Sequence, residues 1–399
     1  MSQKEEETQD NDGSIFSQIT QDIISDSNNP YQQQQQHAAP SKKINTDKWK
    51  DDDDEDNDAE IQQMLEQANQ KAKLAASTLT QPDDDYVKRI AVNSTIPGVQ
   101  IALGNFTLAF NYLRSQLGIT SAFQTLKPII KDIYMSSYTQ FKLVPRLSPI
   151  EFTLRSSSSS ASTLLPQTGI TLSKLQLLLN KGYDAVSNFE MTEAQKAFRD
   201  VLHFALFAIC SSAEEEKAIK DIIYICTEYI YLTKISLLAE DVKDKDKTKY
   251  CDLVCLMSVC KLEVNEHKFL IYKKAKNCCK SIKNFITGLG FIKKMLSLEN
   301  EVVNVFGTKE FDKCRQELIS YQTIATNQHQ LDFNINEALP HIRSFYDPKS
   351  LKRVNVNEKV LVCPLCNAVS AGERKGEVCD VCNLCTLGEE VIGLKLREY

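Results

Sequence analysis

Between positions 171 and about 328 the chain repeats one pattern, in which apolar residues recur every three or four positions. Three segments show it most clearly, through Leu172, Leu175, Leu178 and Leu179, then Ala194, Ala197, Phe198, Val201, Leu202 and Ala205, then Ala218, Ile222, Ile225, Tyr229 and Leu232. This spacing places the apolar side chains on one face of a helix. Short polar turns join the segments, so neighbouring helices can cover each other's apolar faces. The pattern predicts a mainly α fold of helical hairpins, solenoid-like and degenerately tetratricopeptide-like, in which the period of about 34 residues is not kept.

Helical periodicity also precedes this region. Positions 106–119 form one predicted helix ending at Gly118, and positions 122–141 form a second helical unit that Pro128 interrupts. The segment 145–168 contains three prolines and the run RSSSSSAST, which favours a flexible loop. Together these elements predict a helical domain over residues 86–350.

The first 85 residues have a different composition. Residues 1–60 hold 16 Asp and Glu against 5 Lys and Arg, so the remaining residues 61–399 sum to +5 within a net charge of −6. Runs such as YQQQQQH and WKDDDDEDND cannot bury enough apolar surface to fold. We therefore expect residues 1–85 to be a disordered acidic, glutamine-rich tail. Trp49, beside the acidic run, belongs to a solvated linker or anchors a short docking motif.

Three features indicate the compartment. The start MSQKEEETQD lacks the basic residues and apolar stretch of a signal peptide. No apolar run approaches the roughly 18 residues that span a bilayer, so no transmembrane segment is expected. Thirteen cysteines without a signal peptide favour a reducing compartment and free thiols. The sequence predicts a cytoplasmic protein, and its mildly basic body is not the concentrated basic face of a nucleic-acid binder.

Catalytic signatures are missing from the sequence. It contains no glycine-rich phosphate loop, G-x-S-x-G elbow or H-E-x-x-H pair. Only five histidines occur, and His203 lies within an apolar stripe, which is typical of a hydrogen-bonded core or boundary residue. The pattern predicts that the chain is not an enzyme and holds no catalytic cofactor. Eight cysteines of the helical region are interpreted as small core hydrophobes: Cys210, Cys226, Cys251, Cys255, Cys260, Cys278, Cys279 and Cys314.

A cysteine cluster near the C-terminus has metal-ligand spacing. Cys363 and Cys366 form one C-x2-C pair, Cys379 and Cys382 form another, and Cys385 follows three residues after Cys382. Zinc takes four ligands in a tetrahedron, and each C-x2-C turn supplies two thiolates. The intervening residues leave room for a hairpin between the pairs, with 368–370 as a strand and 371–376 as the turn. We therefore predict a small zinc-ribbon-like β module over 351–399, in which Cys363, Cys366, Cys379 and Cys382 bind one structural Zn²⁺.

Alternatives to this site remain open. The module could be a zinc-free β unit with reduced cysteines, and Cys385 is either a spare thiol or an exchangeable fourth ligand. A redox C-x-x-C normally belongs to a thioredoxin-like βαβ unit, which the surrounding sequence does not resemble. A ubiquitin-ligase ring needs eight ligands for two zinc ions, more than the five cysteines present here.

Several segments resemble a known family. The segments are NYLRSQLGI, the helix pair LLPQTGITLSKLQLLLNKGYDAVSNFEMTEAQKAFRDVL and the ending KGEVC…GEEVIGLKL. They are similar to the C-terminal region of the coatomer alpha subunit, and the resemblance extends over about 106–396. The resemblance implies a structural, noncatalytic subunit of the COPI vesicle coat, peripheral on Golgi membranes and vesicles and active in Golgi-to-ER and intra-Golgi transport. It also implies that this helical region binds the coatomer epsilon subunit and associates with other coatomer subunits.

Two further expectations accompany this resemblance. Full-length alpha subunits begin with β-propellers that read cargo tails, and this sequence shows no propeller-type repeat. The chain is therefore expected to be a fragment, a mispredicted gene product or a separately encoded C-terminal portion, without direct recognition of cargo tails. The alternative function is a generic helical-repeat adaptor with a structural zinc ribbon in another cytosolic assembly.

Overall fold

The computed structural model describes residues 94–121, 123–137, 139–141, 150–152, 168–210, 212–331, 333, 341–354 and 359–393. The predictions for the tail 1–85, for Trp49 and for most of the loop 145–168 lie outside these residues. The chain divides into two compact units. The smaller unit contains an antiparallel strand pair, β1 (Thr139–Phe141) and β2 (Ile150–Phe152), and the larger one contains the elements described below.

Three helices open the larger unit: α4 (Pro97–Ala102), α5 (Phe106–Leu117) and α6 (Phe123–Ser137). Helix α4 packs against both α5 and α6. Helix α5 ends at Gly118, whose φ of 66° is the left-handed conformation that closes many helices. The sequence led us to expect that Pro128 interrupts the second helix, and this expectation was wrong. Pro128 lies inside a continuous α6, near its beginning, where the hydrogen bond it removes is made to an early turn of the helix.

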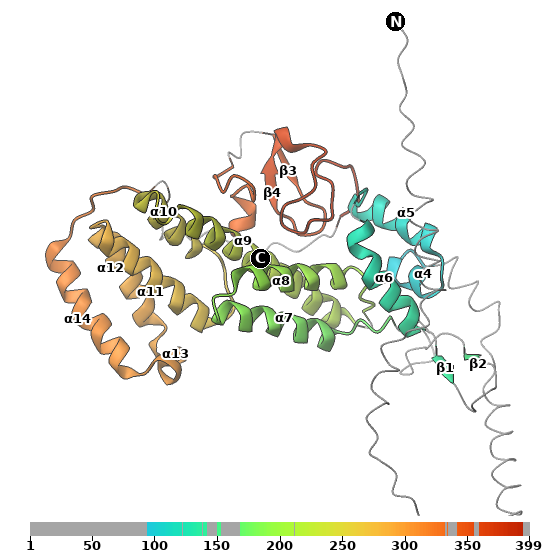
Figure 1. Ribbon diagram of the computed structural model, residues 1–399, viewed down its shortest axis with the longest axis horizontal. Coiled ribbons are helices and arrows are strands. Elements are labelled where there is room, and N and C mark those ends of the chain that lie inside the picture. The colour runs from blue at the N-terminus through green and yellow to red at the C-terminus, as the bar shows by residue number, and fades with distance from the viewer. Residues whose placement is uncertain are drawn as a thin grey trace, which may run out of the picture. The chain divides into compact units, whose positions relative to one another are not determined.

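A longer helical array follows. Its helices are α7 (Leu172–Ser187), α8 (Met191–Ala205), α9 (Ala213–Val242), α10 (Lys247–Met257), α11 (Asn265–Ser281), α12 (Phe285–Ser297), α13 (Glu299–Phe306) and α14 (Thr308–Ile324). From α7 to α12 each helix packs against the next, and α12 packs against α14 (Figure 1). This arrangement confirms the predicted mainly α class with successive helical hairpins.

Side-chain caps help to explain where these helices begin. Thr171, Ser212 and Asp246 precede α7, α9 and α10, and each accepts a hydrogen bond from the backbone N–H three residues later. Those N–H groups have no partner within the helix, so a side-chain oxygen at this position stabilises the first turn, typically by about 1 kcal/mol. The first turn of α9 also carries three glutamates, which favour the positive end of the helix dipole.

Helix α9 is the longest described element. By length and composition it is apolar enough to cross a membrane, which the search for apolar runs in the sequence missed. However, 72% of its most apolar 18-residue window is buried inside the protein. Its buried residues lie around the whole helix rather than on one face, as in the central helix of a packed core.

The lysine-rich helix α11 is paired within the chain. Three of its lysines form ion pairs with other helices: Lys273–Glu310 (2.9 Å), Lys274–Glu240 (3.0 Å) and Lys276–Glu317 (2.5 Å). Lys276 is buried, with 2% of its surface exposed. Side chains from α11, α12, α13 and α14 also share an apolar core: Phe269, Ile292, Met295, Val302, Phe311, Cys314 and Tyr321.

The chain then returns to α9. A short 3-10 helix, η2 (Ile342–Ser344), packs against α9, and the hydroxyl of Tyr231 donates to the carbonyl of Tyr346 (2.8 Å). Beyond it, residues 359–393 form a small unit that we call the cysteine module. It contains the antiparallel strands β3 (Val360–Val362) and β4 (Val369–Ala371) and the 3-10 helix η3 (Gly372–Arg374).

A buried carboxyl group lies where the chain returns to α9. Glu228 is fully buried, and its Oε2 accepts a hydrogen bond from the backbone N–H of Lys261 (2.9 Å). Its Oε1 accepts no hydrogen bond from the described residues and lies 3.9 Å from Nδ1 of His341. Burial raises the pKa of Glu228 to about 7, whereas burial and the nearby Arg343 lower the pKa of His341 to about 4. Near pH 6 both groups are therefore mostly neutral, and they do not form an ion pair.

This burial predicts a pH-dependent stability. Between the unfolded pKa of roughly 4.3 and the folded pKa of about 7, the folded state keeps the Glu228 proton that the unfolded state releases, so stability falls as pH rises. Glu228→Gln should remove this loss of stability with rising pH, because glutamine does not titrate. The unfolding free energy of the variant should gain on wild type by up to about 1.4 kcal/mol per pH unit between pH 5 and 7, as measured by urea denaturation. Glu216→Gln, at an exposed carboxylate on the same helix, is the control. Parallel pH profiles for wild type and Glu228→Gln would contradict the prediction.

Candidate metal centre

Two turns of the same form build the centre. We call them the first knuckle, Cys363 to Asn367, and the second knuckle, Cys379 to Asn383. In each, the backbone N–H of the asparagine donates to the carbonyl of the first cysteine, at 3.0 and 2.8 Å. Both asparagines have positive φ, 54° and 56°, a conformation that asparagine tolerates better than most residues. This left-handed residue closes the turn directly after the second cysteine of each pair.

The first knuckle is itself the turn of a β-hairpin. Strand β3 leads into it and β4 leaves it, with Val362 paired to Val369. We expected a hairpin between the two cysteine pairs, with its turn at 371–376, and this expectation was wrong. Because β4 pairs with the upstream strand, residues 372–374 are free to form η3, and the second knuckle is closed separately by the bridge between Val378 and Thr386.

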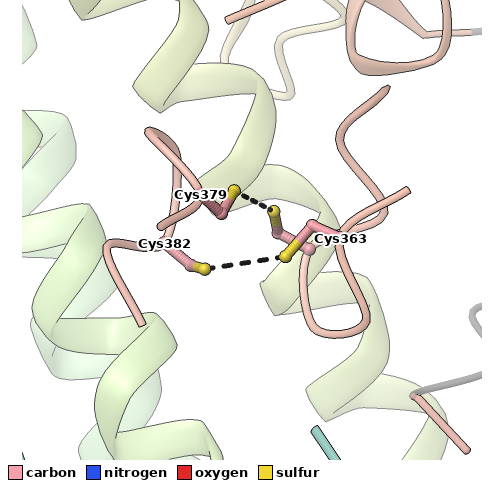
Figure 2. Close-up of side chains that lie close together, drawn as sticks. Cys363, Cys379 and Cys382 are labelled. Atoms are coloured by element: carbon pink, nitrogen blue, oxygen red, sulfur yellow. Dashed lines mark hydrogen bonds between the residues drawn. The ribbon is translucent and has the colours of Figure 1, made fainter. Parts of the chain in front are cut away.

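The knuckles bring four sulfur atoms together. The Sγ atoms of Cys363 and Cys382 are 3.7 Å apart, as are those of Cys366 and Cys379, and all four lie within 4.8 Å of one another. Figure 2 shows the labelled side chains of Cys363, Cys379 and Cys382 directed toward a common centre. Four thiolates around a tetrahedral zinc ion with Zn–S bonds near 2.3 Å would be separated by roughly 3.8 Å. The arrangement thus has the dimensions of a tetrahedral thiolate site.

Burial makes these thiols unusual. All four cysteines have 0% of their surface exposed. Burial raises the pKa of the Cys363 and Cys366 thiols well above the usual range, because charged sulfur is poorly solvated there. A metal cation reverses this preference, since it binds the thiolate form and displaces the proton. The donor set therefore fits a soft or borderline cation such as zinc.

Cys385 lies beside the cluster but outside the four-sulfur set. It is fully buried, and its carbonyl accepts the backbone N–H of Cys379 (2.8 Å). The neighbouring sulfurs of Cys363 and Cys382 and its burial raise the pKa of its thiol well above the usual range. The position suits a neutral S–H donor to metal-bound sulfur.

Helix α8 supports the second knuckle from one side. The guanidinium of Arg199 donates to the carbonyls of Asp380 (3.0 Å) and Val381 (3.1 Å). Nε2 of His203 hydrogen-bonds with the carbonyl of Cys382 (2.8 Å). The sequence predicted a buried, hydrogen-bonded His203, which the structure confirms, but not its contact with a cysteine of the cluster.

Other contacts hold the remaining sides of the module. Arg374 forms ion pairs with Asp347, Glu377 and Asp380. The end of α5 is joined to the module by backbone hydrogen bonds from Thr386 to the Gly118 carbonyl (2.9 Å) and from Gly393 to the Gln116 carbonyl (2.8 Å). A methyl group on Gly118 would lie 3.1 Å from Cβ of Glu389, so close packing and positive φ both favour glycine there.

The two asparagines are site residues that our reading of the sequence missed. A signal was available, because Asn follows the second cysteine of each C-x2-C pair. Such a repeat points to a backbone requirement for the left-handed conformation rather than to another ligand.

This geometry predicts that two substitutions of Asn383 differ in their effect on stability. Asn383→Val should lower the unfolding free energy by about 2 kcal/mol, because a β-branched residue is strained at positive φ. Asn383→Gly should stay within about 0.5 kcal/mol of wild type, because glycine adopts this conformation without steric cost. Denaturant titration of both variants is the measurement. Equal losses for valine and glycine would show that the asparagine side chain matters more than the backbone conformation.

Comparison with known proteins assigns the sequence to a family. Residues 1–399 match the family model described as the C-terminus of the coatomer (COPI) alpha subunit. Coatomer subunit alpha-2 of Arabidopsis thaliana is 25% identical over 343 residues, which cover 84% of this chain and 27% of that protein. Coatomer subunit alpha of Dictyostelium discoideum is 24% identical over 326 residues, or 79% of this chain and 25% of the relative.

Coatomer subunit alpha-3 of Oryza sativa subsp. japonica is 26% identical over 307 residues, or 75% of this chain and 24% of the relative. The chain thus spans about a quarter of the length of these curated relatives. Because the family model covers every residue, the chain belongs to the family formed by the C-terminus of the coatomer (COPI) alpha subunit.

Proposed function

We propose that this chain is a structural component of the COPI vesicle coat, acting in Golgi-to-ER and intra-Golgi transport. The observation that carries the proposal is the match to the C-terminal family of the alpha subunit over residues 1–399. The chain acts in the cytoplasm and reaches Golgi and vesicle membranes peripherally, through the other coat subunits. Its role is to assemble the coat, and no catalytic step is assigned to it.

The epsilon subunit of coatomer is the partner we propose. The resemblance to the C-terminal region of the alpha subunit implies this contact, and stacked helical hairpins such as α7 to α14 are a common scaffold for binding proteins. Large apolar side chains are exposed near both ends of the array, among them Leu177 on α7 (58% exposed) and Ile319 on α14 (65% exposed). These side chains offer places at which a partner could bury apolar surface.

Co-expression with the epsilon subunit tests the partner. We expect a stable 1:1 complex by size-exclusion chromatography with light scattering. Leu177→Asp and Ile319→Asp probe the two ends of the array without touching its core, and the variant that weakens the complex locates the contact. Two separately eluting monomers would contradict the proposed partner. If coatomer subunits were also missing from pull-downs, the alternative of an adaptor in another cytosolic assembly would be favoured.

We also propose that Cys363, Cys366, Cys379 and Cys382 bind one structural zinc ion. The support is the buried cluster of four sulfurs, whose separations match those around a tetrahedral zinc ion. With four protein ligands no position is left open for substrate, so the ion would stabilise the cysteine module and would not catalyse a reaction. Cys385 remains a buried neighbour outside this four-sulfur set.

Zinc content tests this proposal directly. Protein purified reduced and without chelator should contain about one zinc per chain by elemental analysis. Cys363→Ser and Cys379→Ser should lose zinc and unfold the module while keeping most of the helical circular-dichroism signal, because metal binding supplies folding energy to so small a unit. Cys385→Ser is the matched control and should retain zinc. Wild-type protein with well below one zinc per chain would contradict the proposal, irrespective of whether the chain binds the epsilon subunit.

A further inference from the structure

A second group of cysteines converges inside the helical array. Cys251 and Cys255 lie one turn apart on α10, and Cys279 lies on the neighbouring helix α11. We call these three residues the cysteine trio. Their sulfurs are separated by 3.9 Å (Cys251–Cys255), 3.9 Å (Cys251–Cys279) and 3.6 Å (Cys255–Cys279). All three residues have 0% of their surface exposed.

The three distances have the dimensions of a metal site. A triangle with these sides has a centre about 2.2 Å from each sulfur, close to the metal–thiolate distance of about 2.3 Å known for zinc. The informative quantity is the radius of this triangle, because a larger triangle would leave a central ion beyond bonding distance of its sulfurs. Cys226 and Cys314 are also fully buried, yet neither belongs to a group of three ligand atoms within 4.8 Å among the described residues.

The ligand set indicates which ion would fit. Three sulfurs surround the centre, and the described residues add no fourth ligand atom to the group. Zinc in structural sites takes four ligands, whereas a soft monovalent ion accepts fewer and prefers thiolates. Cu(I) has this preference. Each sulfur that binds as thiolate would release its proton, so that two thiolates and one thiol leave a single negative charge on the bound centre.

A polar pair lies near this buried centre. Asp252 follows Cys251 on α10, and its carboxylate hydrogen-bonds with Nε2 of His329 (2.9 Å). His329 is 31% exposed, so the surface is one contact away from Asp252, the neighbour of Cys251 in the sequence. An ion could therefore reach the trio through a local opening of the segment around 329 without unfolding of the array.

We propose that Cys251, Cys255 and Cys279 form a second metal site, distinct from the cysteine module, that binds one Cu(I) ion through three cysteine sulfurs. The site joins α10 to α11, so occupancy would fasten two consecutive helices of the array. This inference does not depend on the proposed coat function.

Copper titration tests the site in the full chain. Zinc-loaded, reduced protein is titrated without oxygen with Cu(I) held by bicinchoninate, and copper and zinc are counted after desalting. We expect about one copper per chain with the zinc retained. Cys255→Ala should weaken copper binding by at least about 100-fold, since even the loss of an outer-shell partner of a metal costs 10- to 100-fold. Cys226→Ala, which truncates an equally buried cysteine outside the trio, should bind like wild type.

A second measurement uses wild-type protein alone, in case a variant fails to fold. Cysteine alkylation in mild urea, read by peptide mass spectrometry, should slow at Cys251, Cys255 and Cys279 when copper is bound and stay unchanged at Cys226 and Cys314. Equal copper uptake by wild type and a folded Cys255→Ala variant would overturn the proposal, as would copper that only displaces zinc and leaves the trio unprotected. A second zinc ion bound at the trio in place of copper would overturn the assignment of the ion.

Discussion

The covering of α9 on all sides is the constraint on which the larger unit depends. A helix that is apolar around its circumference has to be enclosed, since half-covered it would leave a large apolar face in water. Helices α7, α8 and α10 and the 3-10 helix η2 all pack against it. Polar side chains of α9 join it to later parts of the chain as well. The hydroxyl of Tyr231 donates to the Tyr346 carbonyl, and Lys234 lies 3.9 Å from the Asp380 carboxylate in the cysteine module. The helical array and the cysteine module thus share one central element.

Hydrogen bonding explains why the cysteine module lies against α8. A turn as short as the second knuckle exposes backbone carbonyls that it cannot pair internally, and buried carbonyls without donors destabilise a fold. Arg199 and His203 lie one turn apart on α8 and supply these donors. The helical array therefore completes the cysteine cluster as well as carrying it.

Local patterns in the sequence predicted the parts of the structure that depend on local physics. Apolar spacing predicted α7, α8 and α9, because a helix repeats its contacts with any one neighbour every three or four residues. The paired cysteine spacing predicted which four sulfurs would meet, because each C-x2-C turn is a local structure. The effect of Pro128 was misjudged, because tertiary packing of α6 outweighs one lost hydrogen bond near the start of the helix.

Features that depend on distant contacts could not be predicted in this way. The hairpin was predicted between the two cysteine pairs, whereas its turn is the first knuckle itself. Nothing in the sequence of residues 360–362 distinguishes this strand from other short apolar runs. The convergence of the cysteine trio could not be predicted, because Cys279 is 24 residues from Cys255 and only the packing of α10 on α11 brings them together. The role of His203 was missed for the same reason, since its partner Cys382 is 179 residues away in sequence.

The hydrogen bond between the hydroxyls of Thr120 and Thr386 (2.6 Å) has a consequence for the order of folding during synthesis. These residues are 266 positions apart, so a ribosome needs roughly 15–50 s to make the second after the first. Throughout that interval the end of α5 has no cysteine module to accept its contacts. The first helices of the larger unit are therefore completed last, when the C-terminal residues emerge, and the nascent chain has to keep that surface from other partners until then.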